Sequence, residues 1–247
     1  MGNTAGRLVA FLRQELVKNA RRLPLPEHSD KSRGYENCCL ARSSLPDHLV
    51  RSLLELNEQI LLLIHEQAST HHAYSNMMLR QFRELWRPLT RGGRERMAGC
   101  PYLLADLGFA EVQRWSGYDA FVRQELMSDV PFFTVPGVAA VARQVFTYAW
   151  DLARTEEGGA RIVLGMPAHC TAQIKTLTVR QIHELAECHR DWLWPRWPRG
   201  GKVWRDLLHA ADSGDIPALE RARAHGHDLI EAESRAATLQ MCGGASQ

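Results

Sequence analysis

Residues 49–64 read LVRSLLELNEQILLLI, and this stretch decides the fold class. Its leucines and isoleucines recur at alternating intervals of four and three residues: Leu49, Leu53, Leu56, Ile60 and Leu63. This spacing places them on one face of an α-helix, and Leu54, Leu61 and Ile64 broaden that face. The pattern lasts about two heptads, which is too short for a coiled coil. It therefore predicts a helix whose apolar face lies in a core or in a dimer seam, and its charged residues argue against a membrane span.

Further helical patterns flank this stretch. Periodic apolar residues predict helices at about residues 75–86, 117–128 and 137–154. Between the first two, residues 91–96 have the composition of a basic turn, and a short apolar element at 101–107 stops at Gly108, a plausible helix C-cap. Downstream, Thr178 and Gln181 match a capping box, in which each side chain accepts a hydrogen bond from the backbone N–H of the other residue. The helix that begins there is expected to run to about residue 189, with Val179, Ile182 and Leu185 facing inward.

The last predicted elements form a helical hairpin. Residues 203–211 and 216–225 are its helices, with Asp215 as an N-cap and Gly226 as a C-cap. The chain has no long run of alternating β-branched residues, so we expect an all-α, multi-helix globular domain at residues 47–233 that ends in this hairpin at 203–230. A flexible segment at 1–46 precedes it, with an amphipathic basic helix and a linker that contains proline and serine, and a tail at 234–247 follows.

Composition narrows the class of protein. The 247 residues carry a formal net charge of +2, with 45% hydrophobic and 23% charged residues. This balance is typical of a soluble globular chain and excludes a strongly polycationic coat for nucleic acid. Six cysteines without a signal peptide favour a reducing compartment over a disulfide scaffold, so we expect a cytoplasmic protein.

Recognisable catalytic and metal-binding motifs are absent from the sequence. It contains no G-x-S-x-G, no P-loop, no G-x-G-x-x-G and no C-x-x-C. His183 and Glu184 begin like a zinc-protease helix, but Glu187 stands where the second histidine would be needed. His169 and Cys170 are chain neighbours, whereas catalytic pairs usually meet through the fold. We therefore expect no enzymatic activity, no bound metal and no cofactor.

The most unusual segment is residues 190–205, which combines four tryptophans with five cations and two prolines. Tryptophan beside arginine is typical of protein interfaces. It is also typical of nucleic-acid binding sites, where cations neutralise phosphates and aromatic rings stack on bases. The third interpretation is plain packing of a connector across the core. Because Pro195 and Pro198 keep the chain extended, neighbouring side chains diverge, so at least one indole is expected outside, beside Arg196 and Arg199. The candidate partner- or DNA-binding residues are Arg190, Trp194, Arg196, Trp197, Arg199 and Lys202.

Residues 160–187 resemble the central part of the FlhD family of flagellar transcriptional activators. The resemblance rests on Leu164-Gly165-Met166, which it places at a helix start, followed without gaps by the helix of Leu177-Thr178, Gln181 and Leu185-Ala186-Glu187. It implies an all-helical regulator that acts in an oligomer with a partner subunit and contacts promoter DNA jointly with it. It also implies a helix pair like a helix-turn-helix around Leu177 and Thr178.

Two functions therefore stand as expectations. The first is a non-catalytic, FlhD-like transcriptional regulator that works with a protein partner, with a homodimer also open. The alternative is a helical adaptor or assembly protein that binds proteins and never touches DNA. Salt-dependent binding to a promoter fragment would separate them, because phosphate contacts weaken steeply as salt rises.

Overall fold

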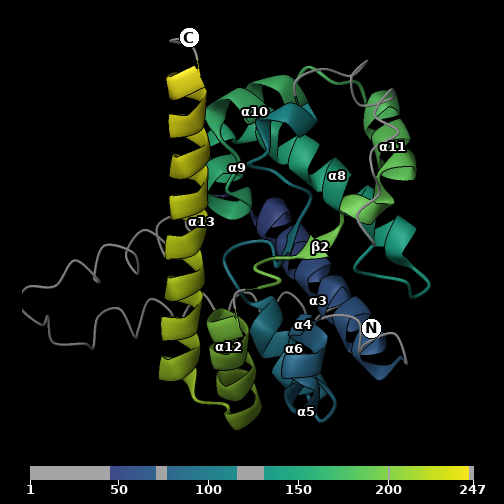
Figure 1. Cartoon of the computed structure of the whole chain (residues 1–247), viewed down its shortest axis with the longest axis vertical. Coiled ribbons are helices and arrows are strands. Elements are labelled where there is room, and N and C mark those ends of the chain that lie inside the picture. Colours follow the sequence, from purple (N-terminus) through teal and green to yellow (C-terminus); the bar gives the residue numbers. More distant parts are fainter. Residues whose placement is uncertain (1–44, 71–76, 116–130, 200, 245–247) are drawn as a thin grey trace, which may run out of the picture.

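The protein is an assembly of α-helices around one continuous apolar core (Figure 1). This computed structural model describes residues 45–70, 77–115, 131–199 and 201–244. The expected basic helix and linker before residue 45, and the helix expected at 117–128, lie outside these ranges. The helices are α3 Asp47–Ser69, α4 Met77–Gln81, α5 Arg83–Trp86, α6 Arg91–Ala98, α8 Val138–Thr155, α9 Glu157–Leu164, α10 Ala168–Ile174, α11 Val179–Cys188, α12 Gly201–Ser213 and α13 Ile216–Gly244. Short 3₁₀ turns cover Val112–Trp115 and Arg190–Trp192. The all-α prediction is confirmed.

The helix that the opening stretch predicted lies at the centre. α3 buries Leu49, Leu53 and Ile60, and it packs on α6 and α8. Of its two buried polar side chains, Asn57 and Gln67, Asn57 bonds to the extended segment that follows α6. The Asn57 amide donates to the carbonyl oxygen of Tyr102 over 2.9 Å, and its oxygen accepts from the Leu104 N–H over 2.8 Å. The segment can run through the core because this side chain replaces a neighbouring strand as hydrogen-bond partner.

The only strand pair in the described residues forms from this same segment. β1, Ala105–Asp106, pairs antiparallel with β2, Trp194–Pro195, so that Ala105 faces Pro195 and Asp106 faces Trp194. The expected turn at 91–96 is instead helix α6, which begins because the Thr90 hydroxyl accepts the Gly93 N–H over 3.1 Å. Gly108 caps no helix. It adopts φ 73° in a turn after β1.

The C-terminal hairpin has the predicted turn and a longer second helix. Gly214 adopts φ 72°, and the Asp215 carboxylate accepts the Ala218 N–H over 2.9 Å at the start of α13. The predicted C-cap at Gly226 is wrong, since α13 continues to Gly244 along one side of the molecule (Figure 1), through most of the expected tail. A Cβ at Gly226 would lie 2.0 Å from the Tyr102 hydroxyl oxygen, so this glycine permits a close helix contact instead of ending the helix.

No described helix has both the length and the apolar character to cross a membrane.

Candidate functional site

The tryptophan-rich connector, residues 190–205, has its middle part, residues 192–197, in the core. After α11 the chain forms a short 3₁₀ turn and then β2. β2 pairs with β1 and lies between α3 and α8 in Figure 1. The next residue extends this pairing, because the Arg196 N–H donates to the Leu104 carbonyl oxygen over 2.9 Å. The extended backbone that the prolines predicted is present at β2 but does not reach Pro198, because Trp197 adopts φ 48°.

Arg196 is a core residue. Its side chain is 3% exposed, and its Nε donates to the Leu103 carbonyl oxygen over 2.7 Å. Its Nη2 donates to the carbonyl oxygen of Leu164, the last residue of α9, and its Nη1 lies 3.8 Å from the Glu233 carboxylate of α13. The expectation of an exposed Arg196 is wrong, because these carbonyls and this carboxylate replace water around the buried guanidinium.

None of the connector's indoles projects freely into solvent. Trp192, Trp197 and Trp204 are buried and Trp194 is half-buried. The Trp204 Nε1 donates to the Arg196 carbonyl oxygen over 2.7 Å, and its ring lies 5.5 Å from that of Trp86. All seven tryptophans of the chain are described, and none falls in the exposed class. The predicted exposed indole is therefore wrong, and stacking of bases on a free tryptophan has no support.

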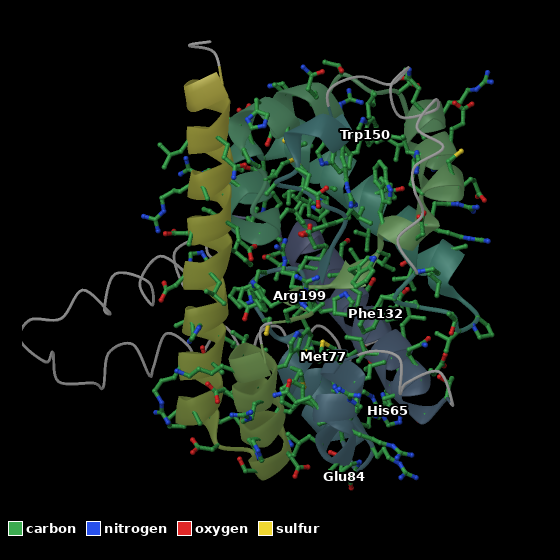
Figure 2. The ribbon with its side chains drawn as sticks, in the orientation of Figure 1. His65, Met77, Glu84, Phe132, Trp150 and Arg199 are labelled. Atoms are coloured by element: carbon green, nitrogen blue, oxygen red, sulfur yellow. The ribbon has the colours of Figure 1, made fainter. Side chains whose placement is uncertain are left out.

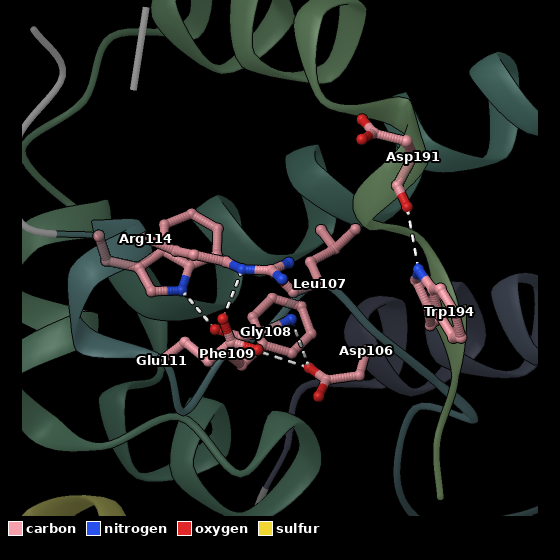
Figure 3. Close-up of polar contacts among 9 residues, drawn as sticks. Asp106, Leu107, Gly108, Phe109, Glu111, Arg114, Asp191 and Trp194 are labelled. Atoms are coloured by element: carbon pink, nitrogen blue, oxygen red, sulfur yellow. Dashed lines mark hydrogen bonds and ion pairs between the residues drawn. The ribbon is translucent and has the colours of Figure 1, made fainter. Parts of the chain in front are cut away.

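The half-buried Trp194 closes a structural turn (Figure 3). Its Nε1 donates to the Asp191 carbonyl oxygen over 3.1 Å. Across the strand pair, the Asp106 carboxylate accepts the N–H groups of Gly108 and Phe109, each over 3.0 Å. This carboxylate is occupied in holding the turn that follows β1.

Three of the six candidate residues are exposed, and they lie at different ends of the connector. Arg190 follows α11, whereas Arg199 and Lys202 flank the start of α12. The start of α12 packs on α4, since a Cβ at Gly201 would lie 3.0 Å from the Gln81 side chain. The structure thus separates the predicted binding residues into one core arginine, two packed indoles and three surface cations.

The helix pair α10 and α11 is the second candidate site. Four residues, 175–178, join the two helices, and both capping-box bonds form: the Gln181 N–H donates to the Thr178 hydroxyl over 3.3 Å, and the Thr178 N–H donates to the Gln181 side chain over 2.9 Å. Ile182 and Leu185 are buried against α8 as predicted. Val179 is not, because it is 48% exposed at the start of α11.

The exposed face of α11 carries little free charge. Arg180 pairs with Glu184 over 2.8 Å along the helix, and Arg143 of α8 pairs with Glu187. Each cation therefore stands beside a carboxylate, and the exposed Val179 is the apolar element of this face. Such a surface is nearer in character to a protein interface than to a phosphate-binding one.

The His169 and Cys170 pair does not form a reactive thiolate. The Cys170 Sγ lies 3.1 Å from the His169 Nε2, but burial raises the pKa of this thiol to about 12 and lowers the pKa of His169. Both shifts favour the neutral pair, whereas a nucleophilic cysteine needs a thiolate. Within the described residues, no group of three or more histidine, cysteine or acidic side chains could hold a metal ion.

Arg199 and Lys202, the two exposed cations at the start of α12, belong to a larger basic surface that the sequence motifs did not predict. Residues 77–98 contain six arginines and two glutamates, and residues 199–206 contain three cations and one aspartate. The signal was available as a local excess of arginine. Residues 91–96 were expected to form a turn, and a turn gives no reason to place their arginines beside those of α12. The excess of positive charge was therefore not predicted as one surface.

No family model, no curated protein and no solved structure matches this chain.

Proposed function

We propose that the protein is a non-catalytic helical regulator, similar to the FlhD family, that acts on promoter DNA in an oligomer with a partner subunit. The observation that supports this proposal is the helix pair α10 and α11, which occupies the segment that resembles that family.

The residues that carry the resemblance stand at helix boundaries. The helix start that the resemblance implied at Leu164-Gly165-Met166 is wrong: Gly165 ends α9 in the left-handed conformation at φ 68°, and the N–H groups of Gly165 and Met166 bond back to the helix. Thr178 and Gln181 begin α11 through the capping box, and Leu185 and Ala186 fill the interface with α8. The motif therefore specifies two consecutive short helices and the turn between them, which is the arrangement of a helix-turn-helix unit.

A specific observation favours the alternative, a helical adaptor that binds only proteins. The cations nearest α11 are paired with Glu184 and Glu187, so this helix offers few free charges to phosphates. An exposed Val179 beside such pairs suits a partner helix.

The deciding experiment is selection of genomic fragments by the full-length protein. Tagged protein with its co-purified partners is mixed with sheared DNA of the source cell, and retained fragments are sequenced at low and at physiological salt. A regulator enriches a small set of fragments, and this enrichment weakens as salt rises. Equal recovery of all fragments at both salts overturns the proposal.

The double variant Val179→Asp, Arg180→Glu locates the contact, with Arg161→Glu on the exposed side of α9 as the matched control. If the double variant keeps its protein partners but no longer enriches DNA fragments, α11 contacts the DNA. If the wild-type protein enriches no fragment and the double variant loses a protein partner, the protein is an adaptor.

A further inference from the structure

We infer that a basic surface formed by α4, α5 and the start of α12 binds the phosphate backbone of duplex DNA. This arginine-rich surface consists of Arg80, Arg87, Arg199, Lys202 and Arg205, and the inference rests on the proposed function, which supplies DNA as the ligand.

Tertiary packing brings these cations together from segments more than 110 positions apart. The rings of Trp86 and Trp204 lie 5.5 Å apart and join the end of α5 to α12. The Arg205 guanidinium lies 5.9 Å from the centre of the Phe82 ring, between α4 and α5. A further contact joins α6 to α12: the Arg96 Nε donates to the Ala211 carbonyl oxygen, near the end of α12, over 2.8 Å. The helices that carry the surface are therefore held by buried contacts and do not depend on the cations themselves.

Charge is concentrated at this place. Residues 77–98 and 199–206 together carry a formal charge of +6, while the whole chain carries +2, so all other residues together carry −4. Arginines outside the arginine-rich surface are often neutralised: Arg91 of α6, Arg114, Arg143, Arg180 and Arg235 each pair with a carboxylate. None of the five cations of the arginine-rich surface forms an ion pair with a described residue, and all five are exposed.

The chemistry of the surface favours the backbone of a duplex over other anionic partners. Single strands are held largely by stacking on aromatic rings, but Phe82, Trp86 and Trp204 are buried beneath the cations. A protein interface needs an apolar centre, and within the segments of this surface Met77 is the one large apolar side chain in the exposed class; Figure 2 labels it together with Arg199 and Glu84. Exposed guanidinium and ammonium groups without exposed rings suit phosphate contacts that position a protein on DNA. This surface also supplies the free positive charge that α11 lacks.

The test measures the salt dependence of binding to a fluorescein-labelled mixed-sequence duplex, by anisotropy, with the full-length protein and its co-purified partner. The double variant Arg80→Gln, Arg205→Gln should weaken binding and lower the slope of log K against log salt by about 2, because each phosphate contact contributes about 0.9. The matched control is Arg51→Gln, Arg161→Gln. Both control residues are exposed, and the start of α3 adjoins α9, since a Cβ at Gly159 would lie 2.6 Å from the Leu45 side chain. α9 lies far from α5 in Figure 1.

The outcomes separate the two proposals. Wild-type protein that fails to bind the duplex at low salt overturns the proposed function and this inference with it. Wild-type binding whose slope is the same in the Arg80 and Arg205 variant overturns the inference alone. A preference for the corresponding single strand, or an equal loss of slope in the control variant, also overturns it. Both double variants should unfold at the same melting temperature as the wild-type protein, so that a change in slope reports a change in binding and not a loss of folding.

Discussion

Arg196 and Leu103 are 93 positions apart in the chain, and the Arg196 Nε donates to the Leu103 carbonyl oxygen over 2.7 Å in the core. The same guanidinium bonds the end of α9 and lies beside Glu233 of α13. One side chain thus joins the segment before β1 to two helices. Its charge is tolerated there because backbone oxygens take the place of water.

Arg196→Ala should lower the free energy of unfolding by about 2–5 kcal/mol, since it leaves two buried carbonyl oxygens without their donors. Chemical denaturation monitored by circular dichroism measures this loss. Arg199→Ala, three residues further on and exposed, is the control and should stay within about 0.5 kcal/mol of wild type. Equal stability of the two variants would show that Arg196 does not hold the core.

Leu53→Ala should cost about 2–5 kcal/mol of stability, because Leu53 is fully buried in α3 and its truncation leaves a cavity. Leu62 lies on the same helix but is 40% exposed, so Leu62→Ala should cost much less. The two unfolding midpoints, compared at equal protein concentration, provide the measurement. Similar losses at both positions would contradict the observed orientation of α3.

Thr178→Ala should remove the N-cap of α11 and cost about 1 kcal/mol. Thr178→Ser keeps the hydroxyl and should keep most of the stability. Thermal unfolding of both variants distinguishes the cap from a general effect of substitution, and an unchanged melting temperature in the alanine variant would refute the role of the capping box.

Burial of His227 should make the stability depend on pH. Its ring is 1% exposed, and neither ring nitrogen has a hydrogen-bond partner among the described residues. Burial lowers the pKa of His227 from the ordinary 6.5, against the smaller opposing effect of Glu231 and Asp228. The unfolded chain therefore takes up a proton below about pH 6.5 that the folded chain resists. Stability is complete above this pH and falls as the pH drops toward the lower folded pKa.

His227→Leu should flatten the loss of unfolding free energy between about pH 7 and pH 5, because it removes the group that the unfolded chain protonates. His209→Gln, at an exposed position of α12, is the control and should leave the slope of stability against pH unchanged. Parallel pH profiles for wild type and the His227 variant would exclude His227 as the titrating group.

Local patterns alone determined some of the helices and helix ends, among them α3 and the start of α11. The spacing of Leu49, Leu53, Leu56 and Ile60 predicted α3, and Thr178 with Gln181 predicted the start of α11. These features depend on helix periodicity and on hydrogen bonds between residues three apart, so nearby residues suffice to specify them. The turn of the final hairpin, with Gly214 and Asp215, is predictable for the same reason.

Only the tertiary structure decided what the connector and Gly226 do. A run of tryptophan and arginine has the same composition on a surface or in a core, and Arg196 belongs to the core because carbonyl oxygens from residues 103 and 164 converge on it. Gly226 looked like a helix end, yet α13 continues past it, and the position requires glycine because Tyr102 occupies the space that a side chain would need. The arginine-rich surface likewise exists only once Trp86 meets Trp204. In each case the partner lies far away along the chain, and its position follows from the packing of the whole core and not from the local sequence.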